Sequence, residues 1–225
     1  MKWIKYGVTL SRITENDIEL VRHWRNHPDI MKTMQFRENI TSEMQKKWFK
    51  SINNLNNYYY LIHYNGEKIG MINNKNVDWN TRTSEAGIFI WNENFDFVPL
   101  LASLLLCEAG FYILQGGYSF VHTLRTNHKA IEYNLMLGYE LYKDDPTEDT
   151  QEYRLTRENF EKQTVKLREA ALKLSGNDSM MYMILEKHDY ESGLVQFIES
   201  IEKDFHLNYN FRFENGEKIY SCVVG

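Results

Sequence analysis

Histidines and cysteines are the residues that most often bind metals or act as nucleophiles. His23 and His27 are four residues apart, a ligand spacing on a helix, but Pro28 ends the predicted helix at that point. Cys107 lies in an apolar run and Cys222 in a predicted terminal strand, so neither has the exposed, electropositive setting of a reactive thiol. We therefore predict no metal site and no cysteine nucleophile.

A second group of polar residues lies where predicted elements begin or end. The tripeptide Trp24-Arg25-Asn26 closes the first predicted helix, and Asn127 precedes a short one, where asparagine is a favoured N-cap. Glu85 lies near the start of a predicted strand, whose alternation places it on one face with Phe89. These side chains are the candidates for acid–base chemistry and ligand binding.

Hydrophobic periodicity and turn residues predict the elements that must position these side chains. Within residues 7–160 we expect strands and helices in the order β-α-α-β-β-β-α-β-α-β-β. This order indicates an α/β fold with helices on both faces of a mixed sheet. The expected elements are a strand at 7–13, a helix from Thr14 to Trp24, a helix after Thr41 or Ser42, strands at Tyr58–Tyr64, Lys68–Asn73 and Ser84–Trp91, a helix at Val98–Leu114, a strand at Tyr118–Leu124, a helix at Asn127–Leu137, and strands at Tyr139–Tyr142 and Glu152–Leu155.

The rest of the chain predicts a connecting helix and a small C-terminal unit. Arg157–Leu174 is amphipathic, and the four residues 175–178 form a candidate linker. After the linker we expect a β-α-β-β unit, with a helix at Tyr190–Phe205 and a hairpin of Leu207–Phe213 with Lys218–Val224. The predicted division is 1–160, 161–177 and 178–225. Because so short a segment rarely holds a core alone, we expect the last unit to pack on the first domain or to pair with a second copy as a homodimer.

Composition excludes several classes of protein. The 225 residues carry a net charge of −5, which disfavours nucleic-acid binding, since nucleic-acid binders usually present a basic face. No apolar run is long enough to span a bilayer, and the first residues lack the pattern of a secretory signal. We therefore predict a cytoplasmic protein with no membrane or nucleic-acid partner.

Three short segments follow one another in a distinctive order across residues 7–160. They are the start from Leu10 through Trp24-Arg25-Asn26 to Trp48-Phe49, then Ser84–Ile88 with the sequence SEAGI, then Asn127–Tyr139 with the sequence NHKAI followed by LGY. Together they resemble the GNAT superfamily, and in particular its N-acetyltransferases of amino-sugar nucleotides and of protein N-termini. The resemblance implies a mainly antiparallel central sheet whose fourth and fifth strands splay apart to admit acetyl-CoA.

The resemblance also implies roles in catalysis. Glu85 would act as the general base for the acceptor amine, although an ion pair with Arg82 or another neighbour is its structural alternative. A backbone N–H within Phe89–Trp91 would stabilise the thioester oxyanion. The tyrosine that often protonates the leaving thiolate in this family falls by spacing on Asn134, with Tyr133 adjacent.

Binding roles follow from the same comparison. The pyrophosphate of acetyl-CoA would lie at the N-terminus of the helix that begins at Val98. The residues expected to contact acetyl-CoA are Phe89, Ile90, Trp91, Phe97, Val98, Leu100, Asn127 and Asn134. Trp24, Arg25 and Asn26 would line the acceptor pocket, with core packing of Trp24 and a solvated Arg25 as the structural alternative.

The loop before that helix departs from the family pattern [Q/R]-x-x-G-x-[G/A]. Phe95 and Phe97 occupy the glycine positions, Asp96 adds a negative charge, and Pro99 lacks an N–H. Three functions therefore remain open: acetyl transfer to a small amine, with an amino-sugar nucleotide as the first expectation; protein N-terminal acetylation; and a non-catalytic binding or assembly module that uses residues 178–225.

Overall fold

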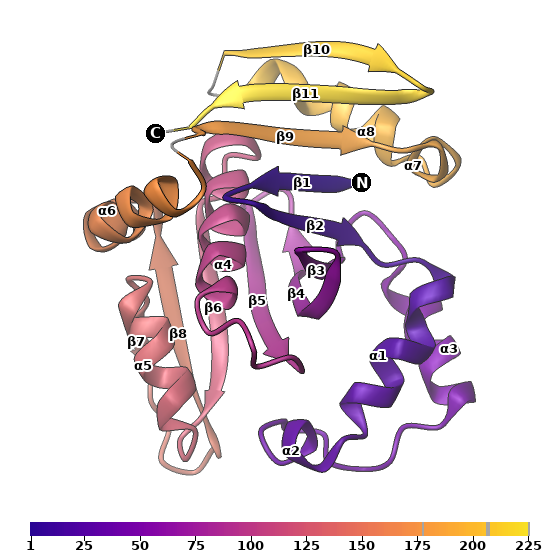
Figure 1. The fold of residues 1–225 in the computed structure, drawn as a ribbon. Helices are drawn as coiled ribbons and strands as arrows, with labels where there is room; N and C mark the ends of the chain where they lie inside the picture. The colour runs from indigo at the N-terminus through magenta and orange to yellow at the C-terminus, as the bar shows by residue number, and fades with distance from the viewer. Residues whose placement is uncertain (177, 206–207, 225) are drawn as a thin grey trace.

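A computed structural model describes residues 1–176, 178–205 and 208–224. The described residues form one sheet of eleven strands in the order β10-β11-β9-β1-β2-β3-β4-β5-β6-β8-β7. Figure 1 shows the strands turning from nearly horizontal at β10 to nearly vertical at β8, as the twist of neighbouring strands accumulates across a wide sheet. The predicted α/β fold with a mainly antiparallel sheet is confirmed.

The elements fall into three consecutive groups along the chain. The first group is β1 (Lys2–Lys5), β2 (Val8–Arg12), a 3₁₀ turn (Glu15–Asp17), α1 (Ile18–Arg25), α2 (Pro28–Met31) and α3 (Ser42–Ile52). The second is β3 (Tyr58–Tyr64), β4 (Glu67–Asp78), β5 (Thr83–Ile90), α4 (Val98–Glu108) with a π-helical extension (Ala109–Ile113), β6 (Tyr118–Leu124), α5 (His128–Met136), β7 (Glu140–Lys143) and β8 (Thr150–Thr156). The third is α6 (Arg157–Leu174), β9 (Met180–Leu185), α7 (Lys187–Glu191), α8 (Leu194–Ile201), a 3₁₀ turn (Glu202–Asp204), β10 (Tyr209–Glu214) and β11 (Glu217–Val223).

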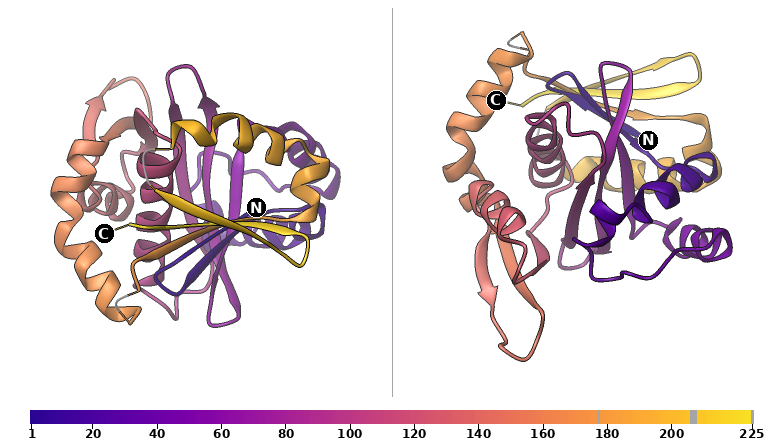
Figure 2. Two further views of the ribbon diagram at one scale, coloured as in Figure 1. Left: turned by 90° about the horizontal axis from the view of Figure 1, so that it is seen from above. Right: turned by 60° about the horizontal axis from the view of Figure 1, so that its bottom comes forward.

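Two apolar clusters lie on opposite faces of the sheet. The smaller cluster joins α1 and α3 to β3, β4 and β5 through residues such as Val21, Leu61 and Met71. The larger cluster surrounds α4, which is apolar on all sides and therefore buried, with Leu104 and Leu105 inaccessible to solvent. Figure 2 shows the helices on both sides of the sheet, as the sequence predicts.

The N-terminal hairpin differs from its prediction. The sequence predicts one strand at 7–13, whereas the chain forms β1 and β2 around Tyr6 and Gly7, which both have positive φ. Strand β1 is missed because Lys5 is only 2% exposed and lies on its buried side, which breaks the expected alternation of apolar and polar residues.

Three helix boundaries also differ from their predictions. Pro28 follows the end of α1 but begins the short α2 at its first position, where proline is favoured. The helix predicted at Val98–Leu114 ends as an α-helix at Glu108 and continues as a π-helical turn. The helix predicted at Tyr190–Phe205 is two helices, because Gly193 adopts a left-handed conformation between them.

The C-terminal unit has the predicted succession of a strand, a helical segment and a hairpin, with two helices in place of one, and it extends the same sheet. β9 pairs antiparallel with β1, and β11 pairs with β9 and β10 (Figure 1). The Nζ atom of Lys5 lies 2.8 Å from the Glu108 carboxylate and 2.7 Å from the Val224 carbonyl oxygen, and both charged side chains are inaccessible to solvent. This buried ion pair joins β1, α4 and the end of β11. Asn177 in the predicted linker and Leu207 in the predicted hairpin lie outside the described residues.

Candidate active site

Strands β5 and β6 separate partway along their length. They run parallel and pair over three positions only, of which Glu85↔Phe120 is the last. β5 then continues to Ile90 along β4, while β6 continues to Leu124 along β8. The two strands therefore diverge past Glu85, and the predicted opening in the sheet is present.

A cleft of about 610 Å³ passes through this opening and reaches both faces of the sheet. Its lining on the side of α1 and α3 is mostly apolar and aromatic, and includes Val21, Met34, Met44, Trp48, Tyr59 and Met71. Its lining on the side of α4 and α5 includes Ser103, Leu106, Cys107, Ala130, Tyr133 and Leu137. A volume of this size accommodates ligands rather than a few water molecules.

Glu85 lies between these two sides, with its carboxylate held by three polar groups. Oε1 is 3.0 Å from Lys75 Nζ and 3.2 Å from His122 Nδ1, and Oε2 accepts a hydrogen bond of 3.4 Å from Asn76 Nδ2. Asn76 has a positive φ and lies where the β4–β5 register shifts. The ion pair predicted as the structural alternative is therefore present, with Lys75, in a residue that also lines the cleft.

The end of β5 offers backbone donors to the opening. The N–H groups of Trp91 and Asn92 both donate to the Ile69 carbonyl oxygen, at 3.0 and 3.1 Å, which makes a bulge. Because hydrogen-bonding direction alternates along an antiparallel strand, Ile88 and Ile90 direct their backbone groups away from β4 and toward the opening. Of these two residues Ile88 lines the cleft, and Ile90 is the one residue of the predicted segment Phe89–Trp91 whose N–H points away from β4.

Two asparagines, one before α5 and one on it, line the cleft, and each makes a hydrogen bond within the protein. Asn127 Oδ1 accepts a hydrogen bond of 3.1 Å from the Ala130 N–H, which confirms the predicted N-cap. Asn134 donates from Nδ2 to Thr123 Oγ1 at 3.0 Å, which ties α5 to β6. Both side chains remain among the residues that line the cleft.

The Tyr133 hydroxyl is bound to α4. It donates to the Pro99 carbonyl oxygen at 2.8 Å and lies 2.8 Å from Ser103 Oγ, which can donate to it in turn. Burial raises the pKa of Tyr133 well above its ordinary value, so the hydroxyl stays protonated. Tyr133 lines the cleft, but its proton is engaged by a backbone carbonyl in this arrangement.

The loop that carries Phe95 and Phe97 packs away from the cleft. Both rings contact Tyr64 edge to face, with centroid distances of 5.3 and 5.6 Å, and neither residue lines the cleft. No residue from 83 to 114 has a positive φ. The loop therefore adopts its path without a conformation that needs glycine.

The three residues at the end of α1 predicted to line the acceptor pocket have different surroundings. Trp24 stacks on Trp91 with the ring planes 5° apart and does not line the cleft. This favours the alternative that Trp24 has a packing role. Asn26 exchanges two hydrogen bonds with the backbone of Ile40, at 2.9 and 2.8 Å, and so fixes the loop before α3. Arg25 alone of the three lines the cleft, with its guanidinium 5.8 Å from the Phe89 ring centroid.

Arg25 and Gln45 are buried donors without partners. Within the described residues, Arg25 Nε and Gln45 Nε2 are inaccessible side-chain nitrogens that make no hydrogen bond, and both residues line the cleft. Gln45 lies on α3 and is 3% exposed, and burial lowers the pKa of Arg25. Buried donors are normally satisfied, so two unsatisfied donors beside a cleft indicate a place for a ligand acceptor group.

The match to known sequences and structures agrees with this geometry. The sequence profile of the acetyltransferase (GNAT) domain matches residues 8–140, more than half of the chain. The chain belongs to the GNAT family of acetyltransferases. It is therefore an acyl-CoA-dependent N-acetyltransferase, and the cleft through the β5–β6 opening is its candidate active site.

Several GNAT proteins are similar to this chain. The acetyltransferase PseH of Campylobacter jejuni is 24% identical over 136 residues, which cover 60% of this chain and 84% of PseH. The apo structure of FdhC, a nucleotide-linked sugar GNAT, superposes with a TM-score of 0.62 at 20% identity over 72% of this chain and 94% of FdhC. The spermidine N-acetyltransferase of Vibrio cholerae, solved with CoA and spermine, gives a TM-score of 0.59 at 16% identity over 69% of this chain and 99% of the other.

The GNAT cleft brings together about half of the predicted site residues. Glu85, Tyr133, Phe89, Asn127, Asn134 and Arg25 line it. Trp24, Asn26, Ile90, Trp91, Phe97, Val98 and Leu100 are not among the residues that line it. Residues that sequence reasoning missed are Lys75, Asn76 and His122 around Glu85, and Gln45 on α3. The one sequence signal for Gln45 as a site residue is its position on α3, next to the apolar residues of that helix.

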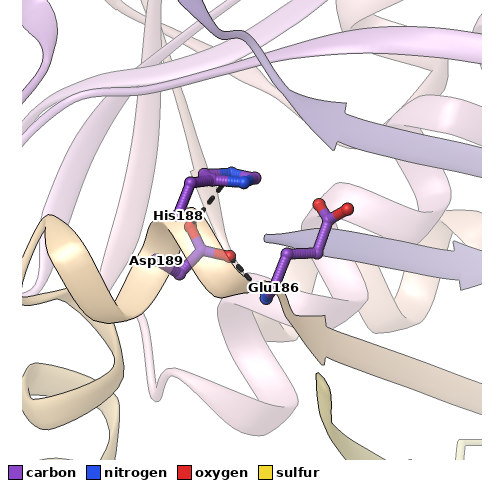
Figure 3. Close-up of side chains that lie close together, drawn as sticks. All are labelled: Glu186, His188 and Asp189. Atoms are coloured by element: carbon purple, nitrogen blue, oxygen red, sulfur yellow. Dashed lines mark hydrogen bonds and ion pairs between the residues drawn. The ribbon is translucent and has the colours of Figure 1, made fainter. Parts of the chain in front are cut away.

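One group of potential metal ligands lies far along the chain, in the C-terminal unit. Within the described residues, Glu186, His188 and Asp189 each offer a ligand atom within 4.8 Å of the others (Figure 3). Asp189 Oδ2 binds the Met1 amino group and the Glu186 N–H, and Glu186 pairs with Lys2 at 2.7 Å. Asp189 Oδ1 is buried without a hydrogen bond and lies 3.5 Å from His188 Nε2. These contacts account for the group as a junction between β1, β9 and α7, and the prediction of no metal site stays a prediction.

Proposed function

We propose that the chain transfers an acetyl group from acetyl-CoA to the amine of an amino-sugar nucleotide. One similar protein points to this class, since FdhC is described as a nucleotide-linked sugar GNAT. PseH, an acetyltransferase, supports the reaction. The observation that carries the proposal is the pair of unsatisfied donors, Arg25 and Gln45, on the acceptor side of the cleft. Phosphate and carbonyl oxygens of a nucleotide are the acceptor groups that such donors bind.

The charges of the cleft separate this proposal from polyamine acetylation. In the described part of the chain the cleft lining contains the cationic side chains Arg25, Lys75 and Arg82, and Glu85 is its one carboxylate. A polyamine carries several positive charges and needs several carboxylates, whereas a nucleotide carries negative charge. The apolar side chains around Met34 and Trp48 would contact the sugar ring.

The acyl-donor side of the cleft fits the arm of acetyl-CoA. Backbone groups of Ile88 and Ile90 face the opening and can pair with the amides of an extended ligand, as an added strand would. At the start of α4 the Val98 N–H already donates to the Phe95 carbonyl oxygen at 3.1 Å, and Pro99 has no N–H. The Leu100 N–H and the helix dipole are therefore what this helix end offers to an anion.

Catalysis then divides among a few groups. Glu85 takes the proton of the acceptor amine, directly or through water, while Lys75 and His122 keep its carboxylate in place. The neutral amine attacks the thioester carbonyl, and the N–H of Ile90 or Ile88 stabilises the oxyanion. The C–S bond breaks, CoA leaves as a thiolate that takes up a proton, and the amine becomes an amide.

The test is a rate comparison between Glu85→Gln and Glu67→Gln. Glu67 lies on β4 and binds Asn92 at 2.7 Å outside the cleft lining, so it is a matched control. Acetylation of a UDP-linked amino sugar should fall about 10²–10⁴-fold in kcat for Glu85→Gln, with acetyl-CoA affinity unchanged, and should not change for Glu67→Gln. Equal rates in all three proteins would remove Glu85 from the mechanism. A preference for spermidine or for an N-terminal peptide would overturn the acceptor class.

A further inference from the structure

The two edges of the sheet are built differently. β7 at one edge has four residues, its register with β8 shifts between Leu141 and Lys143, and a charged residue stands at each end. β10 at the other edge has six residues and pairs with β11 without a register shift. Short, bulged and charged edges resist pairing with another chain, whereas long, regular and apolar edges promote it. The β7 edge is thus protected, and the β10 edge is open to pairing.

The backbone of β10 alternates between β11 and the open side. Asn215 and Gly216 form a two-residue turn with positive φ at both positions, which makes Glu214 and Glu217 a hydrogen-bonded pair. Alternate residues of β10 therefore bond to β11, and those between them do not. Tyr209, Phe211 and Phe213 consequently direct their N–H and C=O groups away from the sheet.

The same three residues form an exposed aromatic row. Phe211 and Phe213 are 54% and 66% exposed, and Tyr209 is half-buried against Tyr220 and Phe205. The row lies on the face of the sheet that carries α8. The Lys218 ammonium, which donates to Glu199 of α8, lies over the rings of Phe211 and Phe213. An aromatic surface next to unpaired backbone groups is the combination found at strand-pairing interfaces.

We propose that β10 pairs antiparallel with β10 of a second copy of this chain, around a two-fold axis at Phe211. The segment Tyr209–Phe213 alternates aromatic, polar, aromatic, polar, aromatic, so it reads the same in both directions about its centre. A two-fold interface requires this kind of self-complementarity. Phe211 lies opposite Phe211 of the partner copy, and Tyr209 lies opposite Phe213, which makes one continuous row of six rings.

Neighbouring registers fit less well. An axis at Arg212 places two arginines directly opposite each other, and like charges in that position are destabilising. An axis at Phe213 leaves Phe211 opposite Asn215 in the turn, so fewer residues pair. In the register at Phe211, Arg212 lies opposite Asn210 and keeps its ion pair with Glu214 of its own chain at 3.1 Å.

Sedimentation velocity of the full chain tests the pairing. We expect wild type to sediment as a dimer, Phe211→Glu as a monomer, and Leu141→Glu on the β7 edge as a dimer. In the Phe211→Glu monomer the new carboxylate lies near Lys218, whereas in the dimer two carboxylates face each other across the axis. A monomeric wild type, or loss of the dimer in Leu141→Glu alone, would overturn the proposal.

Disulfide trapping tests the register without disrupting the fold. Residues opposite each other in a hydrogen-bonded pair have Cα atoms about 5.5 Å apart, within the reach of a disulfide. Phe211→Cys should therefore form a covalent dimer under mild oxidation, and Arg212→Cys should not. The reverse result would place the axis at Arg212, and no covalent dimer from either variant would overturn the strand pairing. Native Cys222 gives little background, because it is 5% exposed and burial raises its pKa to about 11.

Discussion

The β5–β6 opening and the C-terminal β9–β11 extension lie in one sheet but differ in how completely their strands and side-chain donors are paired. At the opening the strands stop pairing after Glu85, and the nearby Arg25 and Gln45 donors have no partner within the described residues. In the extension β9 and β11 pair over six positions, and the buried Lys218 ammonium binds Glu199 at 3.0 Å and Glu202 at 3.4 Å.

This difference separates a region built for stability from a region built for binding. Unsatisfied buried donors reduce the free energy of unfolding, and such a cost is expected at a functional site, where a ligand can supply the missing acceptor. The extension also packs on the loop that joins β4 to β5, where Phe197 of α8 contacts Trp79 at a centroid distance of 4.7 Å, outside the cleft lining. Substitutions in the two regions should therefore affect different measurements.

The largest expected effect is on stability, at the ion pair under the extension. Lys5→Met leaves the Glu108 carboxylate buried without its cation, and breaking a buried pair in this way costs about 3–5 kcal/mol. Denaturant unfolding measures this loss. The double variant Lys5→Met with Glu108→Leu should recover most of it, because both charges are then absent. A single variant as stable as wild type would contradict the view that this pair holds the extension in place.

The next effect is on binding, at the acceptor side of the cleft. Gln45→Leu should weaken acceptor binding by about 1–3 kcal/mol, since the acceptor group loses its partner. The same variant should be as stable as wild type or more stable, because it removes an unsatisfied donor. Calorimetry with the acceptor and denaturant unfolding test the two halves of this prediction. A less stable variant with unchanged acceptor affinity would assign Gln45 to the fold.

A smaller effect is expected in the loop before α4. Phe97→Gly restores a family glycine but removes the ring that packs on Tyr64. We expect it to destabilise the protein by about 1 kcal/mol and to leave acetyl-CoA affinity nearly unchanged, because the ring does not line the cleft. A large gain in affinity would mean that the phenylalanine obstructs the donor.

The smallest effect is expected at Cys107, which lines the cleft next to Glu108. Burial raises the pKa of the Cys107 thiol to about 12, so almost none of it is thiolate at neutral pH. Alkylation with iodoacetamide, followed by intact-mass measurement, should leave the native protein unmodified and without loss of activity. Rapid labelling of the native protein would show that the cleft is wetter than the packing indicates.

The parts of the site that are local in sequence could be predicted. The Glu85 strand and the Asn127 cap have signatures within a few residues of each side chain, and both lie in the cleft as expected. The β5–β6 opening followed from the order of the three family segments. Strand β1 was missed because Lys5, a buried charge, satisfies itself with Glu108 about a hundred residues later in the chain.

The parts of the site that depend on tertiary pairing could not be predicted. Lys75 and His122 reach Glu85 from two neighbouring strands, and their register is set by the whole sheet. Gln45 belongs to an amphipathic helix in which a glutamine is normally exposed. In the structure Trp48, Phe49 and Ile52 of α3 pack on the sheet, but Met44 is 39% exposed and Gln45 is buried beside them.

Calorimetric titration of acetyl-CoA into the wild-type protein, with free CoA in parallel, tests the central claim most directly. We predict saturable binding with a micromolar dissociation constant, because the cleft is open at β5–β6 and the loop phenylalanines pack on Tyr64. Absence of binding at millimolar acetyl-CoA would contradict the proposed function, and would mean that the replaced glycines are required after all.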